Sequence, residues 1–152
     1  MTQEEKHTLL VDLCARLPYH LLGKDTFGKT RELKVVYPTG TIIAQEIDRE
    51  CCSSCGFVPY LRSMSSMTEE EILELYKITY TTWYSDSLYY KNEEWITFKD
   101  SIQNNALCFK SSIWLSDINK VYDWLNAHHL DYRGLIEKGL ALEAPEGMYK
   151  IE

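Results

Sequence analysis

The side chains best suited to chemistry lie close together near the carboxyl end: His128, His129, Asp131, Tyr132 and Arg133. Histidine beside a carboxylate is the arrangement that a general base uses, and arginine binds carboxylates or phosphates through two parallel hydrogen bonds. These residues also have a purely structural interpretation. Asp131 can cap a helix, and Arg133 can pair with Asp131 or Glu137 on the surface. His129 can lie at the C-terminal end of the preceding helix, where the helix dipole favours a positive charge. We favour this second interpretation, which assigns no catalytic residue.

A second group with chemical potential is the cysteine cluster at residues 51–55, formed by Cys51, Cys52 and Cys55. Its Cys-x-x-Cys spacing suits zinc or a redox dithiol. A zinc site needs four ligands, and a thioredoxin-like site needs a strand-to-helix junction; neither context is evident. The sequence therefore predicts no cofactor and no metal. The alternative is a hydrolase or metal-dependent enzyme that brings His128, His129 and Asp131 together with Cys55.

Residues around position 60 have the composition of a protein interface. Tyr60 and Arg62 are followed by Met64 and Met67, and all three residue types are enriched at contacts between proteins. The alternative places Tyr60 and Met67 in the core and Arg62 in solvent. The residues that we predict to bind a partner are Tyr60, Arg62, His129, Tyr132 and Arg133.

Composition limits the kind of partner. The 152 residues fit a single domain, 1–152, with 45% hydrophobic residues and a formal net charge of −7. This charge repels phosphate backbones, so direct nucleic-acid binding is disfavoured, and the aromatic stretch at 83–90 lacks the basic groove that single strands require. An acidic mimic of DNA that inhibits a host nucleic-acid-binding protein is an alternative. With no apolar leader, no membrane span and five cysteines, the sequence predicts a cytoplasmic protein with reduced thiols and leaves its oligomeric state open.

Two helices are predicted in the first part of the chain, and each begins at a capping box. Thr2 and Glu5 form a potential capping box, after which one apolar face is predicted up to Pro18: Leu9, Leu10, Leu13, Cys14 and Leu17. Thr68 and Glu71 form a second box, with Met67 placed to pack on Ile72 and with a three-and-four repeat of apolar residues up to Trp83. The spacing predicts a helix after each box.

Alternating residues predict a small sheet. One hairpin joins 33–37 to 41–47 around Pro38 and Gly40, and a further strand at 56–61 is confined to a sheet edge by Pro59. A second hairpin joins 96–98 to 107–109. Helices then start at Ser116 and at Asp131, the last one ending at Gly139. The fold predicted is α+β: a single domain with an antiparallel sheet packed by an N-terminal helix, a central helix and two C-terminal helices.

Three stretches carry a resemblance: residues 59–71, residues 124–149 and, more weakly, residues 12–19. Together they resemble a family of small uncharacterised proteins of gut anaerobic bacteria and their phages or prophages. The resemblance implies that the protein is encoded on a mobile element and is intracellular. It implies no activity. Ser63 departs from the family, which tends to have proline there. Our leading hypothesis is a non-enzymatic accessory protein that binds another protein, from host or phage, in the host cytosol.

Overall fold

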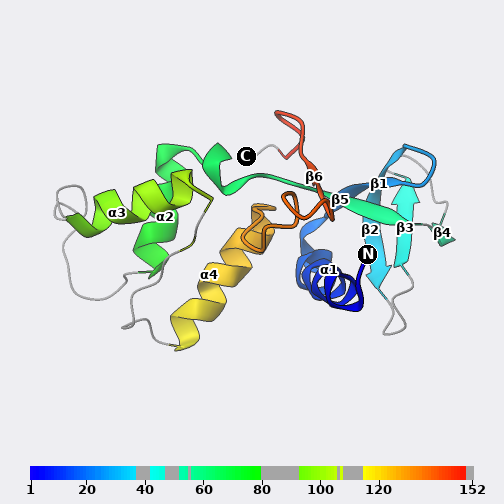
Figure 1. Ribbon diagram of the computed structural model, residues 1–152, viewed down its shortest axis with the longest axis horizontal. Coiled ribbons are helices and arrows are strands. Elements are labelled where there is room, and N and C mark those ends of the chain that lie inside the picture. Colours follow the sequence, from blue (N-terminus) through cyan, green and yellow to red (C-terminus); the bar gives the residue numbers. More distant parts are fainter. Residues whose placement is uncertain are drawn as a thin grey trace.

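The computed structural model describes residues 1–36, 42–46, 52–54, 56–79, 93–105, 107 and 115–149, and within them it confirms the α+β class. Helices α2 (Glu69–Thr79), α3 (Glu93–Gln103) and α4 (Leu115–Ala127) gather at one end, which we call the helical lobe (Figure 1). Helix α1 (Gln3–Arg16) and the strands form the other end, which we call the sheet lobe. Strand β5 runs from the sheet lobe toward the helical lobe (Figure 1).

The sheet has the strand order β4-β3-β2-β1-β5-β6. Its members are β1 (Leu22–Asp25), β2 (Thr30–Val36), β3 (Ile42–Glu46), β4 (Cys52–Ser54), β5 (Phe57–Leu61) and β6 (Leu142–Glu143). The predicted hairpin is confirmed as the antiparallel pair β2 and β3, although its turn lies outside the described residues. The prediction of a purely antiparallel sheet is wrong, because β6 runs parallel to β5. A parallel neighbouring strand comes from a distant part of the chain, so no hairpin turn in the sequence predicts it.

Strand β5 is not the edge that Pro59 led us to predict. It pairs with β1 on one side, where Pro59 faces Gly23, and with β6 on the other. The partners of β6 are Tyr60 and Leu61 only. Proline lacks an N–H donor, and β6 is so short that it does not extend alongside Pro59. The rule that proline avoids the middle of a hydrogen-bonded ladder therefore holds, although the edge prediction was wrong.

The two capping boxes are confirmed. In the first, the backbone N–H of Glu5 donates to the Thr2 hydroxyl over 3.1 Å, and the Thr2 N–H donates to the Glu5 carboxylate. In the second, the Glu71 N–H donates to the Thr68 hydroxyl over 3.2 Å, and the Thr68 N–H donates to the Glu71 carboxylate over 2.8 Å. Each box satisfies backbone donors that the first turn of a helix leaves without an acceptor. Local sequence therefore fixes where α1 and α2 begin.

The buried face of α1 differs from the prediction. Cys14 is exposed, whereas Asp12 and Arg16 are fully buried beside Leu13. The carboxylate and guanidinium lie one turn apart and neutralise each other, which lowers the cost of burying either. A pattern based on hydrophobicity alone assigns such a pair to solvent, and this is why Cys14 was placed on the wrong face.

The second predicted hairpin is wrong, because residues 93–103 form α3. Trp95, Phe98 and Ile102 are buried at helical spacing, while Ile96 is 56% exposed. The prediction relied on the alternation of Ile96 and Phe98, which is a short pattern. The three-and-four spacing of the larger side chains was the stronger signal. Of its proposed return strand, 108 and 109 lie outside the described part of the chain.

The last predicted helix is also absent: residues 132–139 form successive turns. Asp131 does not cap a helix but accepts hydrogen bonds from the N–H groups of Leu135 and Ile136, both over 2.8 Å. Gly139, with φ of 69°, ends the segment as expected. The turns place Leu135 and Leu140 in the sheet-lobe core. Burial of these two residues stabilises the segment in place of helical hydrogen bonds.

Each lobe has its own hydrophobic cluster. The cluster of the helical lobe includes the residues Met64, Met67, Ile72, Leu75, Tyr76, Trp95, Phe98, Ile102, Val121, Leu125 and Leu130. That of the sheet lobe includes Leu13, Leu21, Leu33, Phe57, Leu61, Leu135, Leu140 and Ala141. The chain crosses between them where Arg62 and Leu130 form a parallel bridge, directly after β5. Among the described helices, none is long and apolar enough to cross a membrane.

Candidate functional site

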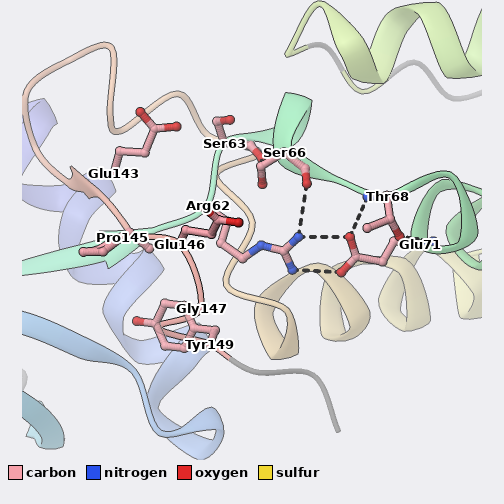
Figure 2. A pocket seen from close by; sticks show the side chains of 11 residues that line it. Arg62, Ser63, Ser66, Thr68, Glu71, Glu143, Pro145, Glu146, Gly147 and Tyr149 are labelled. Carbon is pink, nitrogen blue, oxygen red and sulfur yellow. Dashed lines mark hydrogen bonds and ion pairs between the residues drawn. The ribbon is translucent and has the colours of Figure 1, made fainter.

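A groove of about 370 Å³ lies where the two lobes meet. One wall comes from the end of β5 and the start of α2, and the other comes from the segment that follows β6 (Figure 2). The lining residues are Arg62, Ser63, Ser66, Thr68, Glu71, Glu143, Ala144, Pro145, Glu146, Gly147 and Tyr149. We call this the interlobe groove. Its lining combines hydroxyls, carboxylates and a guanidinium with apolar surface that includes Pro145 and Tyr149, so it suits a ligand with both polar and apolar parts.

The first wall is organised by an ion pair between Arg62 and Glu71. The two guanidinium Nη atoms donate to the two carboxylate oxygens over 2.8 and 2.9 Å, and Nη2 also approaches the Ser66 carbonyl (Figure 2). Burial alone would raise the pKa of Glu71, but hydrogen bonds from Arg62 and Thr68 outweigh it and lower that pKa. The carboxylate is therefore charged, and it holds the guanidinium in one orientation. The alternative that leaves Arg62 in solvent is therefore wrong, because its side chain is only 16% exposed.

The second wall is held by backbone contacts rather than by ion pairs. The N–H of Ala144 donates to the Leu61 carbonyl over 2.7 Å, and Met148 N–H donates to Pro145. Glu143 and Glu146 are exposed, and no basic side chain of the described residues pairs with them. The groove therefore presents two carboxylates that are free to meet a ligand, opposite an arginine that is already neutralised.

Tyr149 fixes the far end of this wall. Its hydroxyl donates to the Tyr60 carbonyl over 2.9 Å and accepts from the Leu22 N–H over 3.0 Å. The ring stacks on His129 with 3.8 Å between centroids and 22° between planes. Burial raises the pKa of Tyr149, which keeps the phenol protonated as this donor. One hydroxyl thus joins β1, β5 and the C-terminal segment, and Tyr149 also lines the groove.

His129 carries no positive charge, contrary to the prediction for a helix end. Burial, followed by the nearby positive charge of Arg16, lowers the pKa of His129 to about 3. Its backbone is left-handed, with φ of 55°, and its carbonyl accepts from the Arg62 N–H over 2.8 Å. The side chain lies under Tyr149 and supports the groove from behind, without lining it.

Tyr132 and Arg133 belong to a different cluster, centred on the buried pair of Asp12 and Arg16. The Arg16 Nε donates to Asp12 over 2.7 Å, and Arg16 Nη2 donates to the Leu130 carbonyl over 2.8 Å. Arg133 lies 3.2 Å from the Asp12 carboxylate, rather than pairing with Asp131 or Glu137 as predicted. Both guanidinium groups contact the ring of Tyr132, at 5.5 and 4.9 Å. This cluster fastens α1 to the turns after α4.

The structure therefore separates the five predicted binding residues. Arg62 lines the interlobe groove, and Tyr60 borders it through its carbonyl bond with Tyr149. His129 lies behind the groove, while Tyr132 and Arg133 are in the α1 cluster. Sequence reasoning missed Glu143, Glu146 and Tyr149 as parts of one wall. The only signal was their place at the end of the 124–149 stretch that carries the family resemblance.

The three residues named for an enzyme that the structure describes, His128, His129 and Asp131, have structural partners. His128 stacks on Trp124, with 3.8 Å between ring centroids, and its Nδ1 lies 2.8 Å from the Trp124 carbonyl. Asp131 is occupied by two backbone N–H groups, as described above. Within the described ranges no three histidine, cysteine or acidic side chains cluster as metal ligands. Cys51 and Cys55 lie outside those ranges, so the cysteine hypothesis stays a prediction.

Comparisons with known proteins add no further constraint to this geometry. No protein-family model matches the chain, and neither the curated proteins nor the solved structures include a match to it.

Proposed function

We propose that this chain is a non-enzymatic accessory protein, carried by a phage or prophage, that binds another protein in the host cytoplasm through the interlobe groove. The setting comes from the family resemblance of residues 59–71 and 124–149. The binding role is supported by one observation: Glu143 and Glu146 stand exposed and unpaired, among the described residues, on one wall of a groove. Carboxylates placed this way attract a positively charged surface.

The groove favours recognition over catalysis because its charged groups are arranged for rigidity. Arg62 is held by two hydrogen bonds to Glu71, and Glu71 also accepts from the Thr68 N–H. A wall that is already ordered loses little conformational entropy when a ligand binds. Neither His128 nor Asp131 lines the groove. The ligand that fits is a polypeptide surface bearing lysine or arginine, with hydrogen bonds to the hydroxyls of Ser63 and Ser66.

The test is affinity capture from the native host, quantified by mass spectrometry, with three versions of the full chain. The wild type is compared with the double variant Glu143→Lys/Glu146→Lys and with a control, Glu74→Lys/Glu137→Lys, which makes the same charge change at exposed positions outside the groove. We expect one stoichiometric partner with the wild type and the control. Its loss in the groove variant alone supports the proposal.

Two results would overturn the proposal. In the first, the groove variant retains the partner, so binding uses another surface. In the second, no variant captures a partner, and the purified chain converts a small substrate. A partner that binds nucleic acid and is released from the groove by added DNA would instead favour the acidic-mimic alternative.

A further inference from the structure

The segment that carries the second wall of the interlobe groove, residues 142–149, adds little to either core. Ala144, Met148 and Tyr149 are half-buried, and the rest of the segment is exposed. Neither hydrophobic cluster includes a residue of this segment, and the last member of the sheet-lobe cluster is Ala141. We call residues 142–149 the strap. A segment that buries so little apolar surface costs little free energy to open locally.

The strap begins at a firmly held point of the chain. The N–H groups of Leu140 and Ala141 both donate to the Leu135 carbonyl, over 2.9 and 3.2 Å, and all three residues are buried in the sheet-lobe cluster. Leu142, the next residue, is 37% exposed. Opening of the strap can therefore stop at Ala141 without unfolding the turns that precede it.

Two sets of contacts hold the strap on the sheet, one at each end. At its start, β6 pairs with Tyr60 and Leu61 of β5, and the Ala144 N–H donates to the Leu61 carbonyl over 2.7 Å. At its end, Tyr149 stacks on His129 and forms the hydroxyl bonds described above. Because both sets are small, the strap depends on each of them.

The Tyr149 hydroxyl lies where two strands would otherwise pair directly. The antiparallel ladder of β1 and β5 ends at Gly23 and Pro59, so the next pair in register is Leu22 and Tyr60. The Leu22 N–H instead donates to the Tyr149 hydroxyl over 3.0 Å, and this hydroxyl donates to the Tyr60 carbonyl over 2.9 Å. The phenol thus bridges two backbone groups in the way that a water molecule does.

This insertion makes departure of the strap inexpensive. Once the phenol leaves, the Leu22 N–H and the Tyr60 carbonyl can bond to each other or to water. No buried backbone group is then left without a hydrogen-bond partner, so the usual penalty for breaking such a bond does not apply.

We propose that the strap opens and closes as one unit while both lobes stay folded, with Tyr149 as its latch, so that the interlobe groove exists only in the closed state. Opening takes Glu143 and Glu146 away from the wall that Arg62 forms. One consequence rests on the proposed function: a basic partner that binds between the walls selects the closed strap, and its apparent affinity falls with the fraction of chains that are open.

Amide hydrogen exchange of the full chain, followed residue by residue by NMR, tests this proposal without a partner. The Ala144 N–H reports on the strap, and the Leu33 N–H, which donates to the Leu21 carbonyl over 2.8 Å, reports on the sheet lobe. We expect protection at Ala144 to be at least about tenfold lower than at Leu33, because local opening precedes global unfolding. Low concentrations of urea should leave exchange at Ala144 unchanged, since local opening exposes little surface.

A latch variant shows whether the strap moves as one unit. Tyr149→Phe keeps the ring but removes the hydroxyl, and it should speed exchange at Ala144, at the other end of the strap, by about tenfold. Exchange at Leu33 should stay within about twofold of the wild type. Tyr132→Phe is the matched control, because it removes a phenol hydroxyl that donates to Asn126 over 3.1 Å, and it should leave Ala144 unchanged.

Three results would overturn the proposal. Equal protection and equal urea dependence at Ala144 and Leu33 in the wild type would mean that the strap leaves only when the chain unfolds. Unchanged exchange at Ala144 in Tyr149→Phe would remove Tyr149 as the latch, and an equal acceleration at Ala144 and Leu33 would assign it to global stability. If Tyr149→Phe does not fold, the wild-type comparison decides alone. None of these outcomes depends on whether affinity capture finds a partner.

Discussion

The core of the helical lobe is aromatic and aliphatic, whereas the sheet lobe buries charges. Tyr76 lies at the centre of the first, with the rings of Trp95 and Phe98 both 5.3 Å away in edge-to-face geometry. The second encloses Asp12 with Arg16 and Asp25 with Arg31. Apolar packing tolerates changes in salt and pH, but a buried ion pair depends on both partners staying charged. The two lobes should therefore fail under different conditions, and the groove between them depends on both.

The largest effect is expected from breaking the ion pair in α1. Arg16→Met leaves the Asp12 carboxylate buried with only Arg133 near it, and loss of one partner of a buried pair costs roughly 3–5 kcal/mol. The double variant Asp12→Leu/Arg16→Met removes both charges and should recover most of this loss. Urea denaturation of the two variants gives the comparison. Equal destabilisation by both would show that packing, not charge, holds α1.

The matching change in the helical lobe is a substitution that creates a cavity in its core. Phe98 is 2% exposed, and Phe98→Ala should lower the free energy of unfolding by about 3 kcal/mol through lost burial and a residual cavity. Because no charge is involved, this loss should be the same at pH 7 and pH 5. A loss that changes with pH would contradict the assignment of charge dependence to the sheet lobe.

His129 supplies a pH dependence at the junction. The folded state keeps this histidine neutral down to its lowered pKa of about 3, while the unfolded chain takes up a proton below about pH 6.5. Stability therefore falls as pH falls between these values, by about 1.4 kcal/mol per pH unit, or roughly 2 kcal/mol from pH 7 to pH 5. His129→Asn, which tolerates the left-handed backbone, should flatten this slope. Denaturation midpoints across pH 5–7 measure it, and an unchanged slope would assign the effect to other groups.

The smallest effects separate the two capping boxes. Thr68→Ala removes the acceptor for the Glu71 N–H and should cost about 1 kcal/mol. Thr2→Ala makes the same change at the exposed start of α1 and should cost less, because Glu5 has no arginine partner comparable to Arg62 of Glu71. Thermal melts of the two variants suffice. A larger loss of stability for Thr2→Ala than for Thr68→Ala would mean that the ion pair between Arg62 and Glu71 does not depend on the second capping box.

Local signals were sufficient for some elements and misleading for others. The boxes at Thr2 and Thr68 fixed two helix starts, because each bond spans three residues of the same chain segment. The α3 helix was missed because a two-residue alternation was weighed above the spacing of Trp95, Phe98 and Ile102. Of the candidate site, Arg62 was identified from residue type alone, but its partner Glu71 was explained only as a cap.

The sequence by itself determined the α+β class, the starts of α1 and α2, the first hairpin and the turn at Gly139, since each depends on residues within a few positions of one another. Tertiary structure alone decided that β6 joins β5, that His129 stacks on Tyr149, and that Glu143 lines the same groove as Arg62. These contacts join segments that are 20 or more residues apart in the sequence. Their geometry depends on how the two cores pack, which no local pattern encodes.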